Sequence, residues 1–277
     1  MSQTDTAQDT SAAQSSWSSA LLTVSLGQKL LLLSCGTSPP ISTSLSRWEF
    51  NMTDIKKAIF VHGAWADSDC WDKARALIEA GGVATSVVHL PLTRFSEDVA
   101  AVAEALEAES GSVLLVGHSY GGAVITQAGV HKNVAGLVYI NAFVPDVGES
   151  ALGLTALVAP SPMSAELRPD EKGFLSLTHT GVFEGFAQDV SEQEKVALFK
   201  NQRPTSAEAL STTVTEAAWH SKPSWYLLAT QDNAIPPELQ SMFVTRIGAV
   251  HATVDAGHCS MISRPGAVAE LVLRAAL

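Results

Sequence analysis

The sequence predicts an α/β protein built on a mostly parallel sheet of about six strands, with helices on both faces. From residue 55 onward, short runs rich in β-branched residues alternate with segments that repeat apolar residues at helical spacing, and the strand comes first in each pair. The 277 residues are 46% hydrophobic and 16% charged, which is typical of a packed globular protein. A chain of this size can bury a substantial core in one domain.

The expected elements follow in chain order. The strand candidates are the apolar runs Lys57–Val61, Thr85–His89, Ser112–Val116, Val134–Ile140, Trp225–Ala229 and Val250–Val254. The helix candidates, each with one apolar face, are Asp69–Glu79, Ser96–Ala108, Gly121–Val130, Pro237–Arg246 and Arg264–Ala276. Ser96 is expected to be the N-cap of its helix, because a serine oxygen there accepts a free N–H of the first turn.

The alternation is interrupted between the fourth and fifth strands. Residues 146–221 contain no strand-like run but carry helical patterns at Ser191–Phe199 and Ala207–Ala218. A segment inserted at this point lies over the carboxyl ends of parallel strands. We therefore expect one domain over residues 52–277, with a core of 52–145 and 222–277 and a helical cap of 146–221.

Residues 1–51 are expected to be a disordered N-terminal extension, because they are rich in Ser, Thr and Gln and end in an irregular Pro-containing run. A signal peptide would explain the apolar run before Cys35. However, Asp5 and Asp9 make the leader acidic, and Lys29 interrupts the apolar run. We expect a cytoplasmic protein, with a secreted or lipoprotein form as the alternative.

Charge and cysteine content narrow the ligand classes. A net charge of −11 argues against nucleic acid and anionic membranes as partners, since both require a basic face. The three cysteines, Cys35, Cys70 and Cys259, lack metal-site or disulfide spacing and are interpreted as free thiols. With no metal-ligand cluster and no phosphate-binding glycine loop, we expect no cofactor and no metal. A neutral small molecule is the expected ligand, and a homodimer is left open.

The strongest local motif is a G-x-S-x-G turn around Ser119. Gly117-His118-Ser119-Tyr120-Gly121 follows an apolar strand and opens a helix. A sharp strand-to-helix turn puts Ser119 in a strained backbone conformation, and side chains at Gly117 and Gly121 would clash there. The turn therefore predicts Ser119 as a nucleophile.

A nucleophilic serine needs a base and an acid that orients it, in the chain order Ser, acid, His for this type of turn. Asp232 and His258 each follow a predicted strand and satisfy that order. Asp146 and Asp255 are the alternatives for the acid. His62 and His118 flank the site in turns where structural hydrogen bonding is the expected duty, and the remaining histidines have no matching context.

Oxyanion donors are expected from two turns. His62-Gly63-Ala64-Trp65 follows the first strand, and the helix after Ser119 begins with free N–H groups. The candidate donors are the backbone amides of Ala64 and Tyr120. Trp65 is the candidate substrate-binding residue.

Four stretches resemble the α/β-hydrolase superfamily over about residues 55 to 277: HGAW from His62, GHSYGG from Gly117, Pro223 to Pro236, and GHCSMISRP from Gly257. The chain looks similar to small bacterial esterases related to plant methylesterases and hydroxynitrile lyases. The resemblance implies the α/β-hydrolase fold, with a helical cap after the fourth strand, and hydrolysis of carboxylic esters through an acyl-enzyme.

Three other activities stay open. Hydroxynitrile lyases of this family carry a Thr in the first oxyanion turn and a Lys after the catalytic histidine, where this chain has Gly63 and Cys259, so ester hydrolysis is preferred. Cofactor-free perhydrolases share the same Ser-Asp-His set. A ligand receptor with residual hydrolase activity is the alternative from another class.

The expected substrate is a small to medium hydrophobic ester. Apolar and aromatic cap residues are expected to line the pocket collectively: Phe174, Leu175, Leu177, Phe183, Phe186, Phe199 and Trp219.

Overall fold

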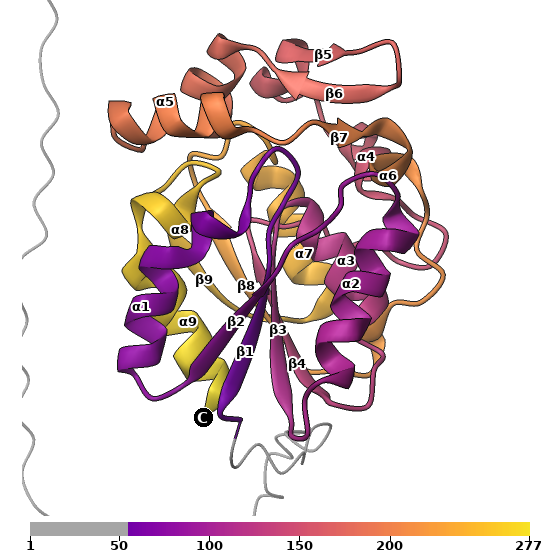
Figure 1. Cartoon of the computed structure of the whole chain (residues 1–277), viewed down its shortest axis with the longest axis vertical. Helices are drawn as coiled ribbons and strands as arrows, with labels where there is room; N and C mark the ends of the chain where they lie inside the picture. Colours follow the sequence, from indigo (N-terminus) through magenta and orange to yellow (C-terminus); the bar gives the residue numbers. More distant parts are fainter. Residues whose placement is uncertain (1–54) are drawn as a thin grey trace, which may run out of the picture. The chain divides into compact units, whose positions relative to one another are not determined.

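A computed structural model describes residues 55–277 (Figure 1). The predicted extension of 1–51 and Cys35 lie outside the described residues. The predicted six-stranded parallel sheet is confirmed, in the strand order β2-β1-β3-β4-β8-β9. Its strands are β1 (Lys57–Val61), β2 (Ala84–Val88), β3 (Val113–His118), β4 (Val134–Ile140), β8 (Ser224–Ala229) and β9 (Val250–Val254).

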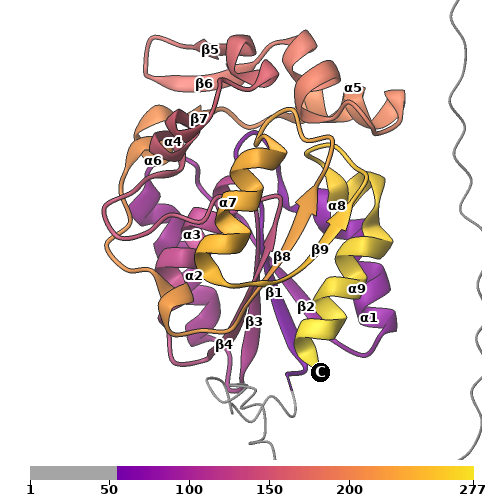
Figure 2. The ribbon, with the colours of Figure 1, turned by 180° about the vertical axis from the view of Figure 1, so that it is seen from behind.

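Helices cover both faces of this sheet, as predicted (Figures 1 and 2). One face carries α1 (Asp72–Ala80), which a 3-10 turn at Ser68–Trp71 precedes, packed on α9 (Pro265–Ala276). The other carries α2 (Phe95–Glu107), α3 (Tyr120–Ala128) and α7 (Pro237–Ile247). The short α8 (Ser260–Ser263) lies between β9 and α9. Because both faces are covered, β3 and β8 are buried along their whole lengths.

The predicted N-cap of α2 is wrong. Arg94 is the N-cap, and Ser96 lies inside the first turn. The reason is Asp98, whose side chain turns inward and accepts the N–H of Leu92 at 2.8 Å. That carboxylate ties the approaching chain to the helix from within the first turn, so a serine cap is not required.

Most of the segment 146–221 lies over the carboxyl ends of the core strands, and the residues after Ser211 return along α3 toward the start of β8 (Figure 1). Its helical elements are α4 (Ala151–Leu154), 3-10 turns at Thr155–Leu157, Pro162–Glu166 and Ala218–His220, a π-helical turn at Gly181–Phe186, α5 (Glu192–Asn201) and α6 (Ala207–Ser211). Ser191 caps α5 in a capping box with Glu194. The predicted helix over Ala207–Ala218 is too long, because the chain becomes extended at Thr212.

The expectation that this segment contains no strand is wrong. It holds a three-stranded antiparallel sheet of β5 (Leu167–Pro169), β6 (Phe174–Leu177) and β7 (Thr205–Ser206). The turn between β5 and β6 explains the hairpin: the Asp170 carboxylate accepts the N–H groups of Lys172 and Phe174, and Gly173 adopts a φ of 81°. No helix among residues 55–277 has the length and apolar character needed to cross a membrane.

Candidate active site

Ser119 lies in the sharp turn between β3 and α3. Its φ of 53° and ψ of −122° place a non-glycine residue in a strained conformation, as the motif predicts. The flanking glycines permit this turn: a Cβ on Gly117 would lie 2.7 Å from the Gly121 carbonyl oxygen, and one on Gly121 would lie 2.6 Å from the carbonyl oxygens of Val61 and His62. The turn therefore presses directly against the end of β1.

Asp232 and His258 meet beside this turn. The Nδ1 atom of His258 lies 2.8 Å from Oδ2 of Asp232, and both side chains are almost fully buried. The His258 ring packs against the ring of His118, with centroids 4.5 Å apart, so it lies against the turn that carries Ser119. The other ring nitrogen, Nε2, is buried and has no hydrogen-bond partner within the described residues. His258 is thus oriented by a carboxylate while its Nε2 remains uncommitted.

The carboxylate of Asp232 is itself held rigidly. Oδ1 accepts the backbone N–H groups of Ala234 and Ile235, both at 2.8 Å. Oδ2 accepts a second bond, at 2.9 Å, from the side-chain amide of Gln240 on α7. Gln240 is fully buried and also bonds the Ile235 carbonyl and the Ala229 N–H. These contacts fix the rotamer of Asp232 before it meets the histidine.

Sequence reasoning missed Gln240. The available signal was a polar residue on the buried face of α7, beside Leu239 and one turn before Phe243. A buried amide requires hydrogen-bond partners, and the nearest loop after a strand contains Asp232.

The competing acids lie in other environments. Asp146 pairs with His220 at 2.8 Å on the surface, and the exposed Asp255 receives a hydrogen bond from Thr230. Neither has a recorded contact with His258, whereas Asp232 does.

His62 and His118 make structural hydrogen bonds, as expected. His62 Nδ1 donates to the Gly63 carbonyl and its Nε2 accepts the N–H of Leu90, which fixes a neutral tautomer. Burial lowers the pKa of His62 to about 4. His118 Nε2 donates to the carbonyl of His258 at 2.9 Å, and burial holds the pKa of His118 well below its usual value. Both rings support the site as neutral groups.

The turn after β1 lies next to Ser119. A Cβ on Gly63 would be 2.7 Å from the Cβ of Ser119, so this position requires a glycine for the close approach. Within residues 55–277, the backbone amides of Ala64 and Tyr120 have no recorded acceptor. These are the two amides that the sequence analysis nominated as oxyanion donors.

Trp65 connects this turn to the cap. Its backbone has a φ of 59°, its N–H donates to Thr205 Oγ1, and its indole Nε1 donates to the Leu175 carbonyl at 2.8 Å. The indole also packs edge-on against Phe186. Trp65 lines the cavity between the core and the cap and joins two cap strands to the core, and its role in substrate binding stays a prediction.

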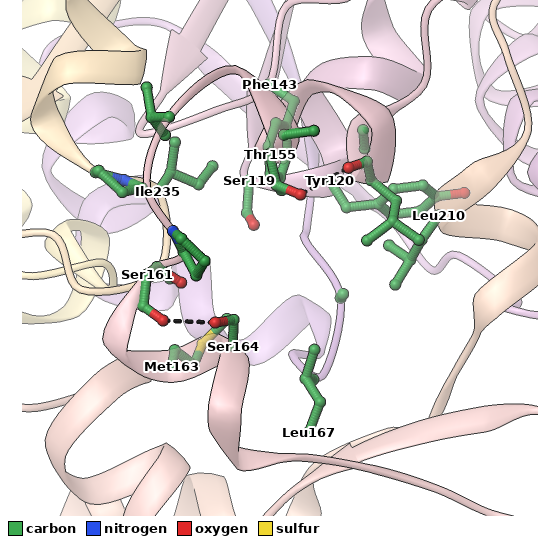
Figure 3. Close-up of a pocket in the computed structure, with 18 of the residues that line it drawn as sticks. Ser119, Tyr120, Phe143, Thr155, Ser161, Met163, Ser164, Leu167, Leu210 and Ile235 are labelled. Atoms are coloured by element: carbon green, nitrogen blue, oxygen red, sulfur yellow. Dashed lines mark hydrogen bonds between the residues drawn. The ribbon is translucent and has the colours of Figure 1, made fainter.

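A cavity of about 430 Å³ opens above Ser119, between the core and the cap (Figure 3). The residues around it include Ser119, Tyr120 and Phe143 from the core, Ile235 from the loop after β8, and Met163 and Leu167 from the cap. No lining residue among those the structure describes carries a charge. The hydroxyls of Thr155 and Ser164 bond backbone carbonyls at 2.7 and 2.6 Å. The cavity therefore suits an uncharged, mainly apolar molecule.

Most of the cap residues that were expected to line this cavity make other contacts. Leu175 is the one residue of that set found in its lining. Phe183 and Phe199 pack around His179, and the Trp219 indole donates to the Pro145 carbonyl. The cap aromatics therefore pack within the cap or against the core, and mainly aliphatic residues line the cavity.

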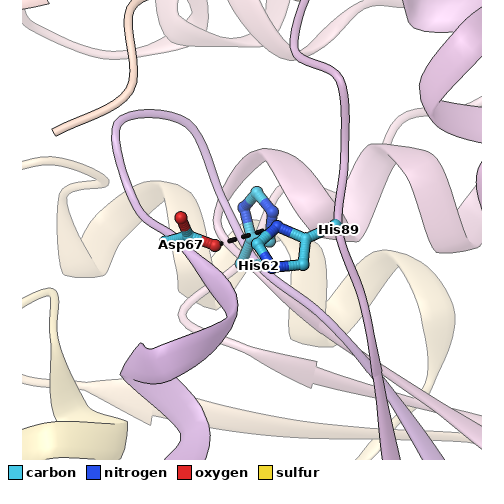
Figure 4. Close-up of side chains that lie close together, drawn as sticks. All are labelled: His62, Asp67 and His89. Atoms are coloured by element: carbon cyan, nitrogen blue, oxygen red, sulfur yellow. Dashed lines mark ion pairs between the residues drawn. The ribbon is translucent and has the colours of Figure 1, made fainter. Parts of the chain in front are cut away.

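His62, Asp67 and His89 come close together at the end of β1 (Figure 4). Both nitrogens of His62 are already bonded to backbone groups. His89 Nδ1 pairs with Asp67 at 3.0 Å, and Asp67 also accepts the N–H of Ser68. A metal ion here would have to break the backbone bonds of His62, so the cluster acts as a structural hydrogen-bond network.

Comparison with known proteins gives a match over most of the described residues. A family model described as "Alpha/beta hydrolase family" matches residues 58–271. A carbendazim hydrolyzing esterase from Nocardioides is 36% identical over 124 residues, which span 39% of this chain and 50% of that esterase. The chain therefore matches about half the length of that relative.

Two further proteins match over longer stretches. An alpha/beta hydrolase of Aspergillus novofumigatus, nvfD, is 30% identical over 205 residues, 67% of this chain and 80% of the relative. The crystal structure of a pyrethroid hydrolase from Sphingobium faniae superimposes with a TM-score of 0.71 at 22% identity, covering 80% of this chain and 98% of that one. This last likeness supports the fold.

Proposed function

Because the chain belongs to the alpha/beta hydrolase family, we propose that it hydrolyses carboxylic esters of small to medium, uncharged, hydrophobic compounds with Ser119 as nucleophile. One observation carries the proposal: His258 is buried beside the Ser119 turn, bonded to Asp232 through Nδ1, and its Nε2 is left without a partner. That arrangement is the one required of a base that accepts a serine proton.

In the proposed mechanism, Ser119 Oγ attacks the ester carbonyl while His258 Nε2 accepts its proton. The N–H groups of Ala64 and Tyr120 stabilise the tetrahedral oxyanion. His258 then protonates the leaving alcohol, and the acyl group remains on Ser119. A water molecule, deprotonated by the same nitrogen, releases the acid, and Asp232 stabilises the imidazolium in both steps.

The cavity supports the substrate class. A charged group entering it would lose its hydration and find no opposite charge on the lining. Cys259, which follows His258, is 1% exposed, and burial raises the pKa of its thiol. This position supplies no cation, which favours ester hydrolysis over the lyase alternative.

The test is a panel of p-nitrophenyl esters with wild type and the Ser119→Ala, His258→Ala and Asp232→Asn variants, each checked for folding by circular dichroism. We expect the first two substitutions to lower kcat by about 10⁴-fold or more. Carbendazim and a pyrethroid are assayed beside this panel, because one relative and one structural neighbour are named for hydrolysing them. A folded wild type without turnover, or Ser119→Ala at full rate, would overturn the proposal.

A matched substrate pair tests the substrate class. p-Nitrophenyl butyrate and p-nitrophenyl hemisuccinate have similar lengths, but only the second carries a carboxylate. We expect kcat/KM for the hemisuccinate to be lower by about 100-fold, because its charge would be buried without a partner. Equal values would contradict an uncharged substrate.

A further inference from the structure

We propose that a dipeptide of the cap, Gln188-Asp189, positions the catalytic pair by holding the residue before Asp232 and the residue before His258. The inference rests on the proposed function, since it assigns a positioning role within the same site. Gln188 and Asp189 lie between the π-helical turn and α5, in a segment that sequence reasoning assigned no role.

Each side chain of the dipeptide bonds one catalytic loop. The side-chain amide of Gln188 donates to the carbonyl of Gln231 at 2.6 Å, one residue before the acid. The Asp189 Oδ2 atom accepts the N–H of Gly257 at 2.8 Å, one residue before the base. The two loops also bond each other, through Gln231 N–H and the Ala256 carbonyl at 3.0 Å. Adjacent cap residues therefore hold both loops at equivalent points.

The side chains of Gln188 and Asp189 lie very close to Gly257. A Cβ on this residue would lie 2.5 Å from Gln188 Nε2 and 2.7 Å from Asp189 Oδ1. The cap side chains thus pack directly on the Cα of the residue before the base. Gln188 Oε1 and Asp189 Oδ1 are buried without partners among the described residues. A contact that leaves two buried acceptors unpaired stabilises the fold poorly, which favours a role in placing the loops.

The core supplies the other hydrogen bonds to the backbone of Gly257 and His258. Asn141 Nδ2 donates to the Gly257 carbonyl at 3.3 Å, and His118 Nε2 donates to the His258 carbonyl at 2.9 Å. The N–H of Gly257 is the polar group that the cap holds. Placement of the His258 ring therefore depends on the cap being seated, and the cap contributes to catalysis as well as to the cavity wall.

The first test compares Asp189→Ala, Asp189→Asn and Lys73→Ala by steady-state kinetics on the best ester of the panel. Asp189→Ala is expected to lower kcat by about 10- to 100-fold, as a small misplacement of a catalytic group does, with KM changed by less than about threefold. Asp189→Asn keeps an oxygen that accepts the Gly257 N–H, so it should retain most of kcat. Lys73→Ala is the matched control, because it removes a different cap-to-core contact, the 2.5 Å ion pair with Glu194.

The second test is the low-field proton NMR signal of the His258 Nδ1–H, which reports its bond to Asp232 without any substrate. The signal should broaden or shift in Asp189→Ala and stay as in wild type in Asp189→Asn and Lys73→Ala. If Asp189→Ala does not fold, Gly257→Ala gives the same test from the core side, because its Cβ would displace both cap side chains.

The outcomes separate the two proposals. Wild-type kcat and an unchanged proton signal in Asp189→Ala would overturn the positioning role, and so would an equal loss in Lys73→Ala. A wild type that hydrolyses no ester would sink the proposed function, while the proton signal would still decide whether Asp189 places His258.

Discussion

The phenol of Tyr120 donates a 2.6 Å hydrogen bond to the carboxylate of Asp98, so the residue after the candidate nucleophile is tied to helix α2. Asp98 is fully buried, and its other oxygen accepts the N–H of Leu92. Burial raises the pKa of Asp98, although the bonds from Tyr120 and Leu92 act in the opposite direction. The Tyr120 hydroxyl is therefore one of two hydrogen-bond donors that stabilise the ionised form of this buried carboxyl group.

Tyr120→Phe is expected to lower the free energy of unfolding by about 1.5–3 kcal/mol at pH 7.5, the range for a bond to a charged group. Tyr139→Phe is the matched control, since its buried hydroxyl bonds the neutral hydroxyl of Thr126 and should cost about 1 kcal/mol. Urea denaturation measures both. The loss of unfolding free energy in Tyr120→Phe exceeds that in Tyr139→Phe at pH 7.5, and this excess should become smaller as the pH falls through the raised pKa of Asp98. Equal losses in the two variants at pH 7.5 would contradict a charged Asp98.

Gln240→Leu is expected to lower kcat by about 10- to 100-fold with little change in KM. The substitution removes the amide that holds Asp232 Oδ2, so the acid can rotate away from His258. Gln127→Leu is the control: that glutamine also spans two segments, bonding the N–H groups of Thr215 and Glu216. A Gln240→Leu enzyme with wild-type kcat would show that Asp232 keeps its position without the amide.

His62 is expected to make stability fall at acidic pH. Its pKa is about 4 in the fold against an ordinary 6.5, so the stability that the neutral ring contributes is complete above pH 6.5 and is lost as the pH falls toward 4. This pKa difference is expected to lower the free energy of unfolding by about 2 kcal/mol between pH 7.5 and pH 5. His62→Gln does not titrate and should lose correspondingly less over that interval in urea denaturation. His118 remains in both proteins and cancels, so parallel losses would refute the assignment to His62.

Gly121→Ala is expected to destabilise the fold strongly, by about 3 kcal/mol or more, because the new Cβ would lie 2.6 Å from two backbone oxygens that cannot move independently. Gly111→Ala is the control, since nothing lies within 4 Å of a Cβ there. Thermal unfolding should separate the two. Similar melting temperatures would mean that the turn around Ser119 can relax.

The core of the fold was predictable because its signals are local. Runs such as Val134–Ile140 are apolar enough to be strands in any context, and the structure reproduces that strand at the same bounds. The turn around Ser119 was predictable for the same reason, because a side chain at Gly117 or Gly121 would clash with nearby backbone atoms. Ser119, Asp232 and His258 lie in the predicted turns, and their catalytic roles stay predictions.

The cap was harder to predict because its short strands lack an alternating pattern and because some of its contacts join residues far apart in sequence. The β5–β6 hairpin relies on Asp170, which sits among polar residues that do not alternate in the way a strand does. Asp189 bonds Gly257, which is far away in sequence, and no local pattern pairs the two residues. Such contacts become visible once the chain is folded.

The indole of Trp65 has a consequence for protein engineering. Because this core residue bonds β6 through Leu175 and β7 through Thr205, the cap is not a module that can be exchanged between scaffolds by joining the chain at residues 146 and 221. A grafted cap would need a backbone carbonyl in the place of Leu175 and a side-chain oxygen in the place of Thr205 Oγ1. Libraries that vary single lining positions such as Met163 or Leu167 leave this attachment intact, and they are the safer route to a changed substrate range.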